Sequence, residues 1–127
     1  MNTEKVVFAF FIVLAATLNL GFVYGDIDVP AHHEVFELFF AVVVNLIATV
    51  LKFGDRSHIG AVHLATSLVA VLQLIAASLV WAYAMYISGQ GPNPGTIASI
   101  VSLSVGALLA NVVSITLLVA ETVQLRR

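Results

Sequence analysis

The chain has 127 residues, of which 61% are hydrophobic and only 9% charged, and its mean hydropathy is +1.06. A soluble domain with this composition would expose large apolar patches, so the lipid bilayer is the expected surrounding. The formal net charge is −2 and cysteine is absent. We therefore expect no nucleic-acid partner, no disulfide and no thiolate metal site.

Four apolar segments are each long enough to cross a hydrocarbon core, which takes about 20 helical residues. They predict an all-α membrane protein with four antiparallel transmembrane helices in a single domain, residues 1–127. The predicted helices cover about residues 4–24, 34–53, 60–88 and 96–123. Little of the chain is left for a domain outside the membrane.

The positions of the basic residues predict an orientation. With four spans, all of them fall on one side of the membrane: Lys5, Lys52, Arg56, Arg126 and Arg127. Cytoplasmic flanks collect Lys and Arg, so both termini are expected in the cytoplasm. The Trp and Tyr residues fall at the opposite ends of the helices, where an aromatic belt is favoured: Tyr24, Trp81, Tyr83 and Tyr86.

The first predicted helix reads as mostly lipid-facing, with Asn19 as the exception. A side-chain amide in hydrocarbon needs a partner, so we expect Asn19 to form an interhelical hydrogen bond. The following connection, DIDVPAHHEVFE, brings acidic residues close to His32 and His33. These are suitable ligands for a divalent metal ion, but their spacing matches no standard zinc or calcium pattern. We favour acidic residues at a helix N-terminus beside solvated histidines, with no metal and no cofactor.

Polar and small residues of the second predicted helix share one face. At about 100° per residue they lie within an arc of about 80°. This stripe consists of Glu34, Glu37, Ala41, Asn45, Ala48 and Lys52. A lipid-facing helix has no use for such a stripe, so it either packs against other helices or lines a wet path through the bilayer.

The turn KFGDRSHIGA after this helix carries Gly54 as a candidate helix C-cap, and Asp55 or Ser57 as a candidate N-cap. This turn and the loop GDIDVPAHHEVFE resemble those of small proteobacterial inner-membrane proteins with four predicted spans and no assigned activity. The resemblance implies a location in the bacterial inner membrane.

The third predicted helix has a second polar and small face, which includes His63, Ser67 and Gln73. His63 is a candidate pH sensor or proton relay, because an imidazole titrates near neutral pH. The alternative, which we favour, is a neutral histidine that donates to a carbonyl or to Asp55.

The fourth predicted helix carries a small residue at every fourth position, a pattern that lets helix backbones approach closely. This ridge consists of Ala98, Ser102, Gly106, Ala110 and Ser114. Asn111 lies beside it. Each helix thus contributes one side-chain amide: Asn19, Asn45, Gln73 and Asn111. The amides either bond to one another and fix the register of the bundle, or replace water around a permeating cation.

Ser, His and carboxylate residues never converge at one depth, so an enzyme is not expected. The hypothesis we favour is a homo-oligomeric channel for monovalent cations, with helix 2 lining a path on the symmetry axis. Its pathway residues are Glu34, Glu37, Asn45, Gln73 and Asn111. The competing hypothesis is a non-conducting scaffold or accessory subunit of a membrane protein complex.

Overall fold

The computed structural model describes residues 3–55 and 57–125, and every regular element in these ranges is helical. Arg56, Arg126 and Arg127, which enter the orientation argument, lie outside the described residues. The elements are α1 (Thr3–Val23), η1 (Pro30–His32), α2 (Val35–Lys52), α3 (His58–Ala82), η2 (Tyr83–Ile87) and α4 (Pro94–Leu125). The described residues contain four helices long and apolar enough to cross a membrane.

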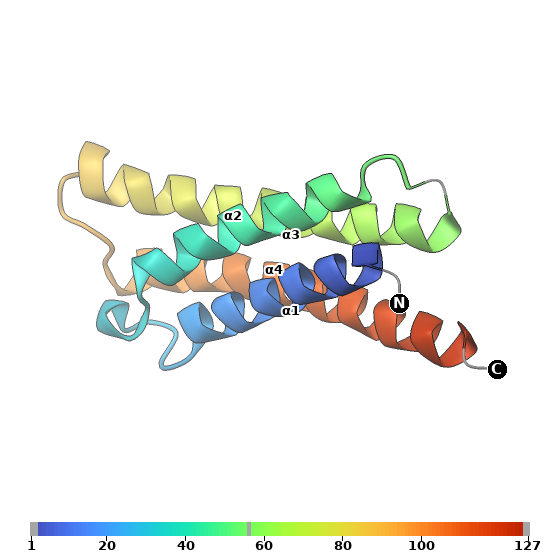
Figure 1. Ribbon diagram of the computed structural model, residues 1–127. Helices are drawn as coiled ribbons and strands as arrows, with labels where there is room; N and C mark the ends of the chain where they lie inside the picture. The colour runs from blue at the N-terminus through green and yellow to red at the C-terminus, as the bar shows by residue number, and fades with distance from the viewer. Residues whose placement is uncertain (1–2, 56, 126–127) are drawn as a thin grey trace.

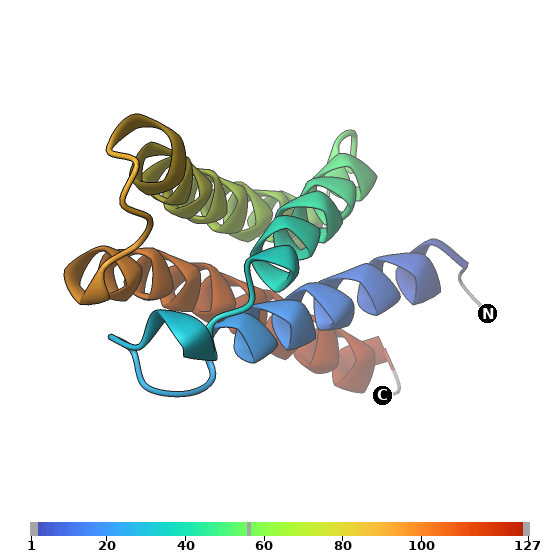
Figure 2. The same cartoon turned by 90° about the vertical axis from the view of Figure 1, so that its left-hand side faces the viewer.

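The four long helices pack as an antiparallel bundle in which each contacts its neighbour along the chain and α4 returns to α1 (Figure 1). The start of α1, the end of α4 and the α2–α3 turn lie at one end, here called the terminal end. The other end, called the loop end, carries the α1–α2 and α3–α4 connections (Figure 2). The α3–α4 contact is the most extensive of the four.

The α2–α3 turn uses the residues that the sequence indicated. Gly54 adopts φ 88°, a left-handed conformation that favours glycine. The Ser57 side chain accepts a hydrogen bond from Gly60 N at 3.0 Å and so caps the start of α3. At the loop end α3 finishes in one π-helical turn, η2, where Ser88 N donates to Tyr83 O.

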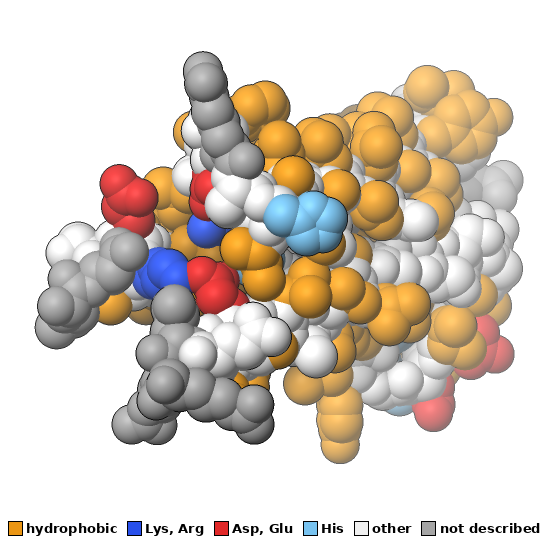
Figure 3. Space-filling model, turned by 90° about the vertical axis from the view of Figure 1, so that its right-hand side faces the viewer, with side chains coloured by type: hydrophobic (Ala, Val, Ile, Leu, Met, Phe, Trp, Pro, Cys, Tyr) orange, Lys and Arg blue, Asp and Glu red, His pale blue; other side chains and the backbone are white. Residues whose placement is uncertain are grey.

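The outward faces of all four helices are apolar. Phe10 on α1, Phe36 on α2, Leu72 on α3 and Leu109 on α4 are each about two-thirds exposed. Charged side chains gather instead at the terminal end, and hydrophobic side chains cover the flanks behind it (Figure 3). This distribution suits hydrocarbon around the bundle and water at its ends.

Inside the bundle, two separate clusters of apolar side chains form the core. The larger cluster lies toward the loop end and includes Phe22, Leu38, Leu74 and Ile100. The smaller one lies toward the terminal end and consists of Phe8, Ile12 and Ala48, with Phe11, Ile115 and Leu118 packed against it. Buried polar residues lie between the two clusters together with Ala15 and Val44.

The α3–α4 contact is close at Gly106, where the side chain of Gln73 packs against the α4 backbone. A Cβ at this position would lie 3.2 Å from the amide carbon of Gln73, so a larger group would have to displace the Gln73 side chain. We expect Gly106→Leu to overpack this contact at a cost of about 1–3 kcal/mol. The thermal midpoint of unfolding in detergent should then fall by about 3–10 °C.

Val105→Leu is the matched control, because Val105 is 45% exposed on the same helix and has space for an added methylene. It should leave the midpoint unchanged. Equal midpoints for Gly106→Leu and the parent protein would show that α3 and α4 are not held this closely.

Candidate functional site

The polar stripe of α2 faces the interior of the protomer. Ala41, Asn45 and Ala48 are fully buried. Glu37 packs directly on Gly21 of α1, where even a methyl group would clash with its carboxylate. Glu34, by contrast, is the exposed residue that precedes α2. The acidic end of the stripe therefore lies at the loop end, and its middle lies inside the bundle.

Five buried polar residues on α2, α3 and α4 lie between the two apolar clusters or beside the smaller one, where the ring of His63 meets that of Phe8 edge-on with centroids 4.9 Å apart. We call them the polar layer: Asn45, His63, Ser67, Asn111 and Ser114. Their position follows from the order of residues on each helix. Asn45 lies between Ala41 of the larger cluster and Ala48 of the smaller one, and Asn111 follows Ala110 of the larger cluster.

His63 and Ser114 join α3 to α4 in this layer. The Nδ1 atom of His63 lies 2.5 Å from Ser114 Oγ, and both residues are fully buried. The sequence-based alternatives for the His63 partner were a carbonyl or Asp55, so the serine hydroxyl was missed. Its only sequence signal was membership of the ridge of small residues on α4, which indicated packing rather than hydrogen bonding.

Ser67 and Asn111 lie about one helical turn from the His63–Ser114 pair, toward the loop end, because α3 and α4 are antiparallel. Ser67 Oγ, His63 Nε2 and both amide atoms of Asn111 have no hydrogen-bond partner among the described residues. Unpaired buried polar atoms are rare and costly, and they commonly bind water or a polar ligand. The polar layer thus contains several donors and acceptors available to a small polar species.

Asn45 is the residue of the polar layer that lies on α2. Its Nδ2 donates to Ala41 O at 2.8 Å on its own helix, and Thr49 Oγ1 donates to Asn45 O. The amide oxygen of Asn45 has no partner among the described residues. The amide nitrogen of Asn45 is therefore bonded within α2, and its amide oxygen can accept a hydrogen bond from another group.

The remaining two amides lie elsewhere. Asn19 Oδ1 accepts a hydrogen bond from Ser104 Oγ at 2.9 Å, so the expected interhelical bond of Asn19 is present and joins α1 to α4 within the larger apolar cluster. Gln73 is half-buried and packs on Gly106 at the α3–α4 contact. The four amides are thus not brought together at a single level.

The ridge of small residues on α4 contacts α3 over part of its length. Ser114 bonds to His63, Ala110 is buried and Gly106 packs on Gln73, whereas Ser102 is exposed. A repeat of four residues rotates about 40° around a helix at each step, so a straight neighbour cannot follow it throughout. The ridge therefore turns away from α3 toward the loop end.

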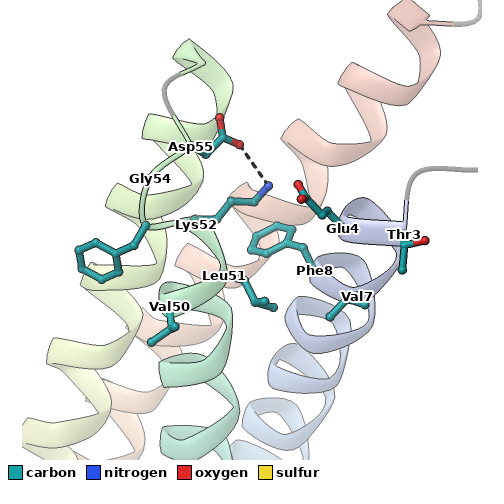
Figure 4. A pocket seen from close by; sticks show the side chains of 10 residues that line it. Thr3, Glu4, Val7, Phe8, Val50, Leu51, Lys52, Gly54 and Asp55 are labelled. Carbon is teal, nitrogen blue, oxygen red and sulfur yellow. Dashed lines mark ion pairs between the residues drawn. The ribbon is translucent and has the colours of Figure 1, made fainter.

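Charged residues form two ion pairs at the terminal end among the described residues. Lys5 of α1 pairs with Glu121 of α4. Lys52 Nζ lies 3.7 Å from Asp55 Oδ2 (Figure 4). Lys52 Nζ also lies 4.3 Å above the ring of Phe8. Hydrogen bonds from the Ser57 hydroxyl and backbone N–H lower the pKa of Asp55, and Lys52 lowers it further. Asp55 therefore stays ionised.

At the loop end, the histidines of the first connection contact the backbone. His33 is buried, with Nδ1 2.6 Å from Phe22 O and Nε2 2.8 Å from Asp26 O. His32 Nδ1 accepts from Asp26 N at 2.9 Å. These contacts fold the connection back over the end of α1, a structural role that its acidic and histidine-rich sequence did not reveal.

A bundle of four long apolar helices, with its charges at the ends and its amides inside, is the architecture of a multi-pass membrane protein. The chain belongs to a family of unknown function, DUF6394, whose family model matches residues 32–122. The match runs from the end of the first connection through most of α4 and includes every residue of the polar layer. Comparison with curated proteins and with solved structures gave no match.

The His63–Ser114 contact leads to a stability prediction. Ser114→Ala would leave the buried Nδ1 of His63 without its partner, which costs about 1–3 kcal/mol. We expect a lower thermal midpoint in detergent. Ser102→Ala, an exposed serine on the same helix, should leave the midpoint unchanged. The same midpoint for both variants would mean that the hydroxyl at position 114 contributes nothing to the bundle.

Proposed function

We propose that this protein conducts monovalent cations, protons in particular, and that the pathway runs through the polar layer inside each bundle. The observation that carries the proposal is the set of unpaired donors and acceptors of Asn45, His63, Ser67 and Asn111, contributed by three different helices at neighbouring depths. Polar groups inside a transmembrane bundle are expensive, and they commonly mark ion or proton pathways.

We place the conduction pathway inside the protomer because the polar stripe of α2 faces inward. A wide pore does not fit within one 13.5 kDa bundle. A chain of hydrogen bonds needs far less room than a hydrated metal ion, and this is why the proton is the favoured cation. The imidazole of His63 can pass a proton between its two ring nitrogens, and its Nε2 atom is unpaired among the described residues.

Charged residues support a path between the two ends of the bundle. Glu34 and Glu37 place negative charge at the loop end, which raises the local concentration of cations. At the terminal end Lys52 pairs with Asp55, and this pairing reduces the repulsion that an unpaired lysine would exert. In this proposal the terminal end faces the cytoplasm of a bacterium, as the positive-inside rule favours, and the protein forms a homo-oligomer in the inner membrane.

The competing function is a non-conducting accessory subunit of a membrane complex. The observation that favours it is the dense packing on both sides of the polar layer. Phe8 and Ile12 are buried toward the terminal end, and Leu74 and Ile100 toward the loop end. A conducting protein must admit water or a proton past these side chains, whereas an accessory subunit need not.

Liposomes reconstituted with the full-length protein distinguish the two functions. We expect proton flux under an imposed pH gradient, and smaller potassium and sodium fluxes, relative to empty liposomes. Asn111→Leu should lower the proton flux about tenfold, because the loss of one hydrogen-bonding group raises the barrier by about 1.4 kcal/mol. Asn45→Leu should act in the same direction.

Thr116→Val is the matched control, because Thr116 is an exposed residue of α4 whose hydroxyl donates to Val112 O of its own helix. It should conduct like the parent protein. Absence of flux in folded, reconstituted protein would reject conduction and favour the accessory subunit. Equal flux in Asn111→Leu, Asn45→Leu and the parent would reject the polar layer as the pathway.

A further inference from the structure

A cavity of about 770 Å³ opens at the terminal end between the start of α1 and the end of α2 (Figure 4). Its walls combine apolar and charged side chains, including Glu4, Phe8, Leu51, Lys52, Phe53 and Asp55. It lies outside the polar layer, and Lys52 and Asp55 of its lining form the ion pair named in the proposed function. The cavity has the size of a small-molecule site.

Lys52 crosses this cavity from α2 toward α1 (Figure 4). Its side chain is only 14% exposed. Among the described residues, its ammonium group meets the Asp55 carboxylate at 3.7 Å and the face of the Phe8 ring at 4.3 Å. Neither is an acceptor at hydrogen-bond distance. A largely buried ammonium with free donors favours an added anionic oxygen, such as that of a phosphate.

Two carboxylates flank this lysine. Asp55 lies on the α2–α3 turn and Glu4 on the first turn of α1 (Figure 4). Asp55 Oδ1 accepts from Ser57, which leaves Oδ2 directed to the cavity and Lys52. Glu4 forms no ion pair among the described residues. One cation between two carboxylates suits a ligand that carries a phosphate and an ammonium group, rather than an anion alone.

The cavity opens toward the flank of the bundle. Val50 and Phe53 line it and are 66% and 63% exposed, so its apolar wall continues onto the outward surface of α2. Lys52 is the last residue of α2, and Thr3 is the first described residue of α1. The charged groups therefore lie at the depth of lipid headgroups, and the apolar wall extends toward the acyl chains.

We propose that this cavity binds the headgroup of a zwitterionic phospholipid that carries a primary ammonium, such as phosphatidylethanolamine. The lipid phosphate lies on Lys52, its ammonium lies between Glu4 and Asp55, and its acyl chains follow Val50 and Phe53. A quaternary ammonium, as in phosphatidylcholine, cannot donate hydrogen bonds to the carboxylates. The headgroup of phosphatidylglycerol would place a net negative charge beside them.

Native mass spectrometry of the full-length protein in detergent tests the proposal. The probe is an equimolar mixture of phosphatidylethanolamine, phosphatidylcholine and phosphatidylglycerol with identical acyl chains. We expect phosphatidylethanolamine to be retained about fivefold or more over the other two, as one charge-assisted hydrogen bond provides. Equal retention of the three lipids by the parent protein overturns the proposal.

Two variants separate the two halves of the headgroup. Lys52→Gln should reduce retention of every phospholipid, because the phosphate loses its donor. Glu4→Gln, a conservative change on an exposed helical turn, should lower only the preference for ethanolamine over choline. Lys5→Gln is the matched control, since Lys5 pairs with Glu121 and does not line the cavity. Unchanged phospholipid retention in Lys52→Gln, or an unchanged preference for ethanolamine over choline in Glu4→Gln, overturns the assignment.

Soluble phosphoethanolamine distinguishes a lipid from a free metabolite as the ligand. If the acyl chains contribute as proposed, millimolar phosphoethanolamine should leave the bound lipid in place. Its displacement of the lipid at a concentration comparable to that of the lipid overturns the lipid assignment. Far-ultraviolet circular dichroism of each variant verifies that the helices are intact before retention is compared.

Discussion

Hydrocarbon cannot form hydrogen bonds, and this constraint organises the whole bundle. A polar side chain on a transmembrane helix either bonds to its own helix or turns inward. The exposed hydroxyls of Thr17, Ser99, Thr116 and Thr122 take the first course, each donating to a carbonyl three or four residues earlier. A carboxamide has more hydrogen-bonding capacity than its own helix can satisfy. Asn19, Asn45 and Asn111 therefore face inward. Their positions determine which faces of α1, α2 and α4 point into the bundle.

This inward placement of polar side chains divides the apolar core in two. Apolar side chains at the two ends of the bundle pack as separate clusters, and the polar layer interrupts them. A continuous apolar core would be more uniform, but it would tolerate a slip of one helix turn along its neighbour. The His63–Ser114 and Ser104–Asn19 bonds join α3 to α4 and α1 to α4 at defined heights, so they oppose such slips. Register and polar chemistry thus come from the same residues.

Much of the fold follows from the sequence, because span length, turn chemistry and the need of Asn19 for a partner are local properties. The direction in which a stripe faces is not local. The stripe of α2 has the same pattern whether it meets α1 or the axis of an oligomer, and the burial of Asn45 and the packing of Glu37 on Gly21 decide between them. The partner of His63 was equally hidden, since Ser114 is 51 residues away. The cavity around Lys52 required three segments to be placed in space.

The π-helical end of α3 affects which aromatic side chains are in contact at the loop end. In an α-helix, side chains five residues apart point in different directions, but the wider turn of η2 brings Trp81 and Tyr86 into edge-to-face contact, with ring centroids 6.0 Å apart. Trp81 also meets Phe39 of α2 at 5.3 Å. It is the single tryptophan of the chain. Its fluorescence is consequently a built-in reporter of the loop end, sensitive both to unwinding of the π turn and to separation of α2 from α3, without any label.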